Sequence, residues 1–152
     1  MGTNYKGSPA EILSLNTYIK LVRAVDEITS KLNSLLLKND LSESQFYVLD
    51  ALFHLGPLAQ KEISKKISCS DGNMTMVIDN LEKEDLVSRT RGTNDRRIYF
   101  VHLTKKGEKK IKSVLPAFVH NVKKLLDTLS NQEQEELQRL TKKIGLSNSV
   151  LD

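Results

Sequence analysis

Apolar residues recur every three or four positions through the first quarter of the chain, the spacing that gathers them on one face of an α-helix. The pattern starts after Ser8, where Pro9 and Glu11 complete a typical capped helix start. It predicts an amphipathic helix from about residue 8 to 38. Its apolar positions are Ile12, Leu15, Ile19, Val22, Val25, Ile28, Leu32, Leu35 and Leu36.

Shorter helical patterns follow in the middle of the chain. A second capping box at residues 42–45 begins a helix that ends at Gly56-Pro57. One short helix is then expected over residues 59–67 and another over residues 71–84, with a tight turn at residues 68–70 between them. Two short helices joined in this way form a helix-turn-helix. The apolar positions of the second one are Met74, Val77, Ile78 and Leu81.

Two strands are predicted next, over residues 86–91 and 98–103, and an arginine-rich turn at residues 92–97 joins them. Both Ile98 and Phe100 are apolar, so the pattern leaves the register of the second strand open. A long helix follows from Thr104. Pro116 lies inside this helix and is expected to bend it, because proline removes a backbone donor.

The last helix is expected over residues 130–145. The predicted fold class is therefore mainly α with a small β-hairpin wing. It consists of a winged helix-turn-helix core at about residues 42–104, flanked by long N- and C-terminal dimerisation helices at about residues 8–38 and 105–152. With 152 residues, the chain fits a single domain.

The long helices predict self-association. Their apolar stripes are larger than a core of about 65 residues can cover. We expect a second copy of the chain to cover them. The alternative is that these helices pack on one another in a monomer.

The net charge of +4 is unevenly distributed. Residues 83–112 carry ten lysines and arginines against four acidic residues, so the rest of the chain is slightly acidic. Clustered positive charge predicts a polyanionic partner, and a solvated basic face is the alternative.

Cysteine content and hydropathy predict a cytoplasmic protein. Cys69 is the single cysteine, so no internal disulfide is possible, and no apolar run approaches the length of a membrane span. His54, His102 and His120 lack metal-ligand spacing, and we expect no metal and no cofactor. No catalytic constellation is recognisable, and an enzyme is not expected.

The helix over residues 71–84 presents side chains suited to DNA bases on the face opposite its apolar set. Asparagine pairs with adenine, and the methyl groups of threonine and methionine contact thymine. These side chains are Asn73, Thr75, Met76 and Asn80. At the start of the helix, Ser70, Gly72 and the free backbone amides are expected near a phosphate. The alternative is an ordinary amphipathic helix with a solvated face.

The arginine-rich turn favours the DNA-binding interpretation. Arg97 is expected to enter a minor groove, held in position by Asp95 two residues earlier. Arg89, Arg91 and Arg96 are expected to contact phosphates, which gives affinity without base information. The alternative is a solvated turn with a local Asp/Arg pair.

Two segments resemble the MarR family of bacterial and archaeal transcriptional regulators. The wing signature is Leu86-Val87-Ser88-Arg89, followed by Asp95-Arg96-Arg97-Ile98-Tyr99-Phe100-Val101-His102-Leu103-Thr104-Lys105-Lys106-Gly107. The segment Met74-Thr75-Met76-Val77-Ile78-Asp79-Asn80-Leu81-Glu82 resembles the recognition helix of the family. The order of helices also agrees, so the resemblance covers residues 1–152 as one MarR-like domain.

The resemblance implies an obligate homodimer that binds a pseudo-palindromic operator in double-stranded DNA and usually represses transcription until an effector intervenes. It also implies that Arg97 is the minor-groove arginine and Asp95 its orienting partner. Two positions depart from the family pattern. Ala59 stands where relatives often have a capping Thr or Ser, and Asp85 replaces the glycine that commonly ends the recognition helix.

Many relatives respond to small phenolic or lipophilic anions. The residues expected to line such a ligand site, which are equally good core residues, are Tyr18, Val22, Phe46, Leu49, Phe53 and Phe118. Oxidation of Cys69 is the other possible trigger, and a buried structural cysteine is favoured over it. The competing function is a winged-helix protein-interaction module without specific DNA binding.

Overall fold

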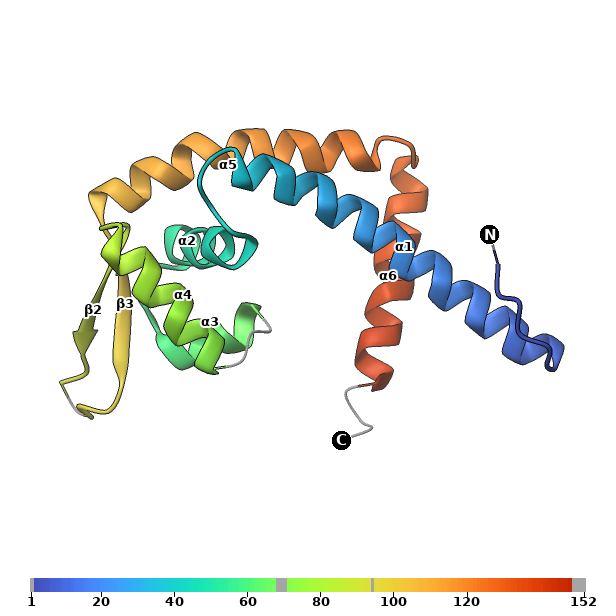
Figure 1. Ribbon diagram of the computed structural model, residues 1–152, viewed down its shortest axis with the longest axis horizontal. Helices are drawn as coiled ribbons and strands as arrows, with labels where there is room; N and C mark the ends of the chain where they lie inside the picture. The colour runs from blue at the N-terminus through green and yellow to red at the C-terminus, as the bar shows by residue number, and fades with distance from the viewer. Residues whose placement is uncertain (1, 68–70, 94, 149–152) are drawn as a thin grey trace. The chain divides into compact units, whose positions relative to one another are not determined.

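The computed structural model describes residues 2–67, 71–93 and 95–148 and has a mainly helical fold with a small antiparallel sheet (Figure 1). The predicted fold class is confirmed. The elements are α1 (Pro9–Leu37), α2 (Glu43–Leu55), β1 (Leu58–Ala59), α3 (Gln60–Ile67), α4 (Asp71–Lys83), β2 (Val87–Arg91), β3 (Tyr99–Leu103), α5 (Lys105–Leu126) and α6 (Asn131–Asn148).

The chain forms two compact units, one ending at Phe118 and one starting at Val119. The boundary falls inside α5, which continues through Pro116 as one helix. The first unit contains the helix-turn-helix and the wing, and the second contains α6.

Local side-chain hydrogen bonds set the helix starts. Ser8 accepts from the backbone N–H of Glu11, whose carboxylate accepts from the N–H of Ser8, and Ser42 and Gln45 repeat this arrangement. The same exchange joins Ser130 and Glu133 before α6. These hydrogen bonds lower the pKa of Glu11 and of Glu133. These hydrogen bonds confirm the predicted capping boxes. The sequence could predict them because each box joins residues only three positions apart.

The sheet has a third strand that the hydropathy pattern did not predict. β1 pairs antiparallel with β3, and the strand order is β1-β3-β2. A two-residue strand is too short to give an alternating pattern. The register of β3 is settled by Val101, which is fully buried and pairs with Leu58 and Arg89. The wing is therefore held by strands on both sides of β3.

The hydrophobic core lies within the first unit. The buried residues come from the end of α1, from α2, α3 and α4, from the sheet and from the first half of α5, and the largest are Phe46, Leu36, Leu41, Leu49, Ile63, Met74, Ile78, Leu81 and Ile111. In α1 only Leu32 and Leu36 are buried. Most of the apolar stripe of α1 therefore lies outside this core.

A close backbone contact joins the start of α5 to the start of the wing. Thr104 caps α5 by accepting from the N–H of Gly107 at 2.9 Å, and its hydroxyl reaches the carbonyl oxygen of Asp85 at 2.7 Å. A Cβ atom on Gly107 would lie 2.0 Å from the carbonyl oxygen of Leu86. Only glycine fits at this position without moving the backbone.

We expect Gly107→Ala to destabilise the protein by about 1 to 3 kcal/mol, because the added methyl group must displace the backbone of Leu86. Chemical unfolding in urea measures the change. Gly145→Ala in α6 is the matched control, since a Cβ atom there meets nothing within 4 Å. An equal effect of both substitutions would contradict the close contact.

Candidate nucleic-acid interface

Helix α4 separates its side chains into a buried and an exposed set. Met74, Ile78 and Leu81 are completely buried, and Val77 is half-buried. The predicted base-contacting side chains, Asn73, Thr75, Met76 and Asn80, are all exposed, and so is Gly72. Ser70 and Cys69 lie outside the described residues, so their predicted roles stay predictions.

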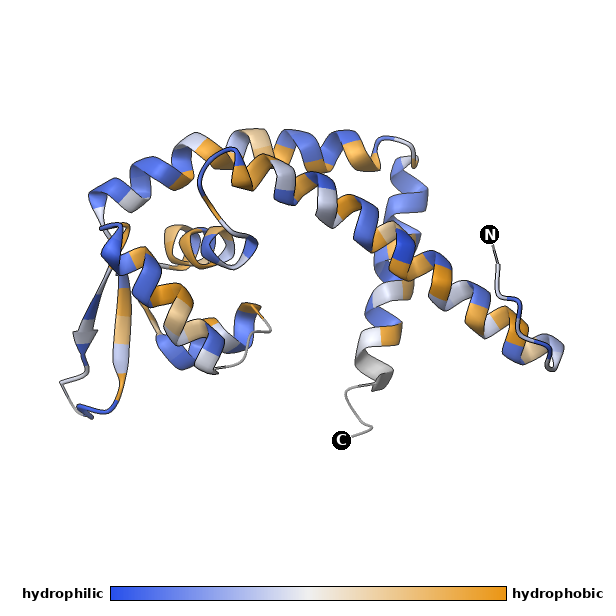
Figure 2. Cartoon of the chain, viewed as in Figure 1, coloured by the Kyte–Doolittle hydropathy of each residue, from blue (hydrophilic) through white to orange (hydrophobic). Residues whose placement is uncertain are grey.

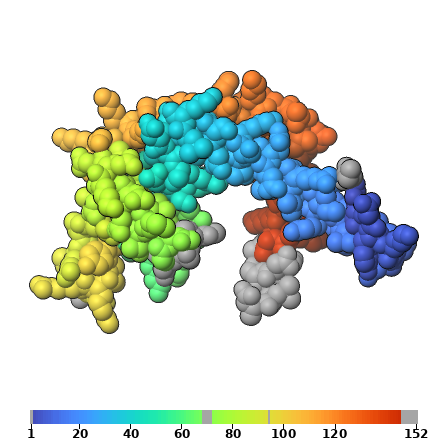
Figure 3. Space-filling model, in the orientation of Figure 1, coloured from blue at the N-terminus to red at the C-terminus, as the bar shows by residue number. Residues whose placement is uncertain are grey.

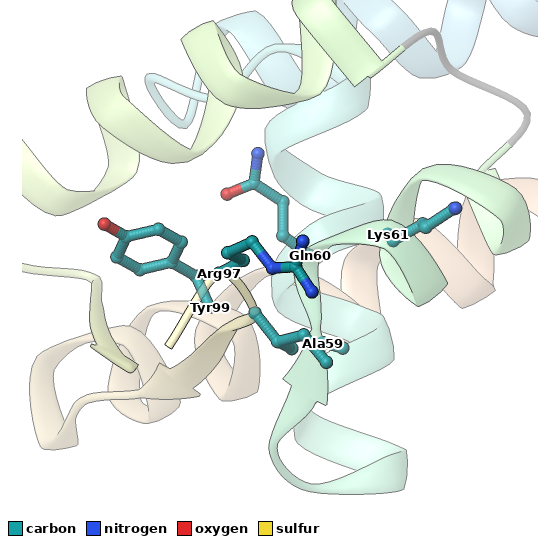
Figure 4. A pocket seen from close by; sticks show the side chains of 6 residues that line it. Ala59, Gln60, Lys61, Arg97 and Tyr99 are labelled. Carbon is teal, nitrogen blue, oxygen red and sulfur yellow. The ribbon is translucent and has the colours of Figure 1, made fainter. Parts of the chain in front are cut away.

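The start of α3 lies beside the exposed face of α4. The side-chain amide of Gln60 donates a hydrogen bond to the hydroxyl of Thr75 at 2.8 Å. Gln60 and Lys61 also line a hollow of about 300 Å³, together with Arg97 and Tyr99 of the wing (Figure 4). Sequence reasoning missed Gln60, Lys61 and Tyr99 as members of this surface. For Gln60 and Lys61, the polar or cationic character of the first turn of α3 was the available signal.

The turn between β2 and β3 is held by Asp95. Its carboxylate accepts from the backbone N–H of Arg97 at 2.9 Å and from the Arg97 guanidinium at 3.2 and 3.3 Å. These side-chain and backbone hydrogen bonds lower the pKa of Asp95. The side chain of Arg97 is nevertheless 90% exposed. Asp95 thus restricts the orientation of the Arg97 side chain but leaves that side chain exposed to solvent.

Two further arginines are exposed on the wing. The Arg91 guanidinium lies over the ring of Tyr99, 5.5 Å from its centre, and Arg96 is exposed in the turn. A stacked guanidinium keeps its outer edge available for hydrogen bonds to an anion. With Arg97 and Lys61, these side chains give the end of the unit next to α3 a positive surface.

Arg89 has a different environment. Its guanidinium binds Asp79, and it also donates to Glu82 from Nε at 3.1 Å and from Nη2 at 2.8 Å. Its backbone N–H donates to the other Glu82 oxygen at 3.0 Å. Partial burial opposes its charged form, but the hydrogen bonds that it donates to Glu82 and Asp79 prevail and raise the pKa of Arg89. We call Arg89, Asp79 and Glu82 the Arg89 clamp.

The lysines counted in the basic cluster lie elsewhere in the same unit. All of them but Lys83, which ends α4, occupy the first turns of α5, at the opposite end of β3 from the arginine turn (Figures 1 and 3). Lys106 donates to the carbonyl oxygen of Glu84 at 2.6 Å, and Lys112 pairs with Glu108. Arg97 of the wing, at the other end of β3, instead lines a hollow with Gln60 and Lys61 of α3.

The residues expected to bind an effector are not gathered around one hollow. Phe46 and Leu49 are buried in the core, whereas Tyr18 and Val22 are exposed on α1. Phe53 and Phe118 are half-buried against the core, and the rings of Phe46 and Phe118 lie 4.3 Å apart. Their ligand role stays a prediction.

A separate hollow of about 410 Å³ lies between α2 and the end of α3. Its lining includes Tyr47, whose ring packs edge-on against Phe46 and Phe118. Burial, followed by the charges of Glu43 and Asp50, raises the pKa of Tyr47. The hollow is lined by Tyr47, Asp50, Ala51, His54, Leu55, Lys66 and Ile67.

Comparison with known proteins identifies the family. A model of the MarR family matches residues 41–99, from the start of α2 to the wing. The transcriptional regulator MhqR of Bacillus subtilis is 31% identical over 88% of this chain and 92% of its own length. The chain belongs to the MarR family.

Two further similarities support a DNA-binding regulator of transcription within the MarR family. The transcriptional repressor MprA of Escherichia coli K12 is 30% identical over 83% of this chain and 75% of its own length. The crystal structure of a MepR–DNA complex from S. aureus matches with a TM-score of 0.78 and 25% identity, over 86% of this chain and 97% of that one. These relatives are regulators of transcription rather than enzymes.

The two departures from the MarR-family pattern are accommodated locally. The backbone N–H of Ala59 donates to the carboxylate of Glu62 at 3.0 Å, so a side chain inside α3 satisfies a donor near the helix start. Asp85 adopts a left-handed conformation with φ of 59°, which aspartate tolerates better than most residues.

The described residues contain no group of three or more histidine, cysteine, aspartate or glutamate side chains arranged to hold a metal ion. Among the described helices, none combines the length and apolar character needed to span a membrane.

Proposed function

We propose that this MarR-family chain is a homodimeric repressor that binds a pseudo-palindromic operator in double-stranded DNA and is released by a small effector. The observation that carries the DNA-binding part is the position of Thr75. It lies on the exposed face of α4, is bonded to Gln60 of α3, and belongs to the same unit as the arginine turn. A groove-entering helix and a cationic wing are the two elements of a winged-helix DNA reader.

The proposed roles follow from exposure and chemistry. Asn73, Thr75, Met76 and Asn80 contact base edges, while Ser70, Gly72 and the adjacent amides approach a phosphate. Arg97 enters the minor groove, where narrow A·T tracts attract a guanidinium, and Asp95 limits its directions. Arg91, Arg96 and Lys61 neutralise phosphates, which supplies affinity without base information.

Homodimerisation is supported by apolar surface that the described residues of each unit leave open. Tyr18, Val22 and Val25 follow one face of α1 and are between 36% and 64% exposed (Figure 2). In the second unit, Leu137, Leu140 and Ile144 recur at helical spacing on α6 and are more than 40% exposed. Stripes of this length indicate a subunit interface rather than scattered surface residues. The assignment of a repressor follows the similarity to MprA.

The effector part of the proposal is supported by the hollow between α2 and α3. Its walls are mainly apolar; Asp50 among them pairs with His54 at 3.2 Å, and Lys66 supplies a positive charge for a small phenolic or lipophilic anion. Ile67, the last residue of α3, also lines it. A bound molecule there contacts the helix that carries the Gln60–Thr75 hydrogen bond.

Selection of bound sequences from random duplex DNA tests the central claim and supplies the operator. On the selected operator, Arg97→Ala is expected to cost about 1 to 3 kcal/mol of binding free energy, most on sites with A·T-rich flanks. Arg91→Ala should weaken all sequences alike and lower the dependence of affinity on salt. Fluorescence anisotropy at several salt concentrations measures both.

Two outcomes would contradict this division. If both variants lost the same binding free energy on every DNA sequence, the minor-groove role of Arg97 would be refuted. No affinity for any duplex at low salt would remove the DNA-binding function and leave a protein-interaction module as the better description.

The dimer claim predicts a molecular mass near twice that of the chain in sedimentation equilibrium at micromolar concentration. Val25→Asp, which places a charge on the exposed stripe of α1, is expected to shift the equilibrium toward monomer, because an unpaired charge in an apolar interface is costly. Lys20→Asp, at an exposed polar position of the same helix, is the control. A monomeric wild-type protein would refute the claim.

For the effector, a panel of phenolic and lipophilic anions is expected to release the protein from the selected operator. Ala51→Leu partly fills the hollow and should raise the concentration needed for release, with little change in operator affinity. Ala10→Leu, near the start of α1, is the control. Unchanged release by Ala51→Leu would place the effector elsewhere.

A further inference from the structure

The Arg89 clamp connects the two elements that the proposed function assigns to DNA. Asp79 and Glu82 are three residues apart on α4, so both carboxylates lie on the same side of the helix. Arg89 is the third residue of β2, and the arginine turn begins three residues later. The clamp therefore joins α4 to the base of the wing.

Glu82 also accepts a hydrogen bond from a backbone N–H at the open edge of the sheet. β2 is an edge strand, since the strand order is β1-β3-β2. The Arg89 N–H donates to Glu82 at 3.0 Å, so a helix side chain takes the place of a neighbouring strand at this point. The two oxygens of one carboxylate thus fix both the backbone and the guanidinium of Arg89.

The local charge balance opposes a phosphate role for Arg89. Two carboxylates face one guanidinium, and the clamp lies close to the proposed DNA surface. If Arg89 turned toward a phosphate, Asp79 and Glu82 would be left as unpaired like charges beside a polyanion. The guanidinium fork fits its present position, because one nitrogen, Nη2, reaches both carboxylates and Nε adds a second bond to Glu82.

We propose that Arg89 is a positioning residue that ties β2 to α4 and sets the direction in which the wing leaves the DNA-facing helix. The inference rests on the proposed DNA-binding function and replaces the phosphate contact that the sequence suggested for this arginine. Simultaneous contact of α4 and the wing with DNA requires a fixed angle between them, and the clamp supplies that constraint.

Glu82→Gln gives a test in which the two roles predict opposite signs. Removing a negative charge beside DNA, and freeing Arg89 for a phosphate, would tighten binding if Arg89 were a phosphate contact. A positioning role predicts weaker binding, by roughly tenfold, because the charge-assisted bonds between α4 and β2 are lost. Glu84→Gln is the matched control, since Glu84 is exposed and close in the chain; it reports the effect of losing one charge alone.

Arg89→Lys provides the second arm. Lysine keeps the charge and binds phosphate as a point charge, but it cannot bridge Asp79 and Glu82 with a fork. We expect Arg89→Lys to weaken operator binding by roughly tenfold, whereas a phosphate-contacting Arg89 would keep most of the affinity when replaced by lysine. Arg91→Lys, on the same strand, should retain most of the affinity.

Thermal melts of each variant show whether it is folded, and a double-mutant cycle between Glu82 and Arg89 keeps the test valid for a partly destabilised variant. Non-additive losses support the clamp. Tighter binding by Glu82→Gln, or wild-type affinity of Arg89→Lys, would overturn it. Absence of DNA binding by the wild-type protein would instead refute the proposed function, so the two failures are distinguishable.

Discussion

The backbone contact between Leu86 and Gly107 determines where the wing can lie. Between α4 and β2 the chain passes through Asp85, which has a left-handed conformation. Thr104 and Gly107, which follow β3, contact the carbonyl groups of Asp85 and Leu86, which precede β2. Both ends of the β2–β3 hairpin are therefore fixed at one point. The wing departs from this point, while the buried side of α4 fixes the helix on the core.

Charge pairing separates the basic residues into different groups. The lysines in the first turns of α5 lie at the end of β3 that the Gly107 contact holds, and Lys106 and Lys112 among them bind protein oxygen atoms. The arginines of the turn are exposed, and the partner of Arg97 among the described residues is Asp95, two positions earlier. A count of charges along the chain combines these groups because it contains no information about which end of a strand each residue occupies.

The sequence predicted those features that depend on neighbouring residues. The capping box at Ser8 and the Asp95–Arg97 pair involve partners two or three positions apart, so spacing alone identifies them. The Gln60–Thr75 bond joins residues fifteen positions apart, and the partners of Arg89 lie across the junction between α4 and β2. Such partners become visible only when helix packing is known. β1 was missed for a similar reason, because it exists only through its pairing with β3.

The Arg89 clamp contributes orientation between α4 and β2 rather than stability. Its three side chains are between 24% and 41% exposed, and ion pairs in contact with water contribute little to stability. Apolar residues at positions 79, 82 and 89 would also pack α4 against β2. They would, however, remove the carboxylate that accepts from the backbone N–H of residue 89 at the sheet edge. They would also allow the strand to slide, since apolar contacts are non-directional. A carboxylate that binds both the backbone and the guanidinium of one residue fixes distance and direction together, which is the property that two DNA-contacting elements in one unit require.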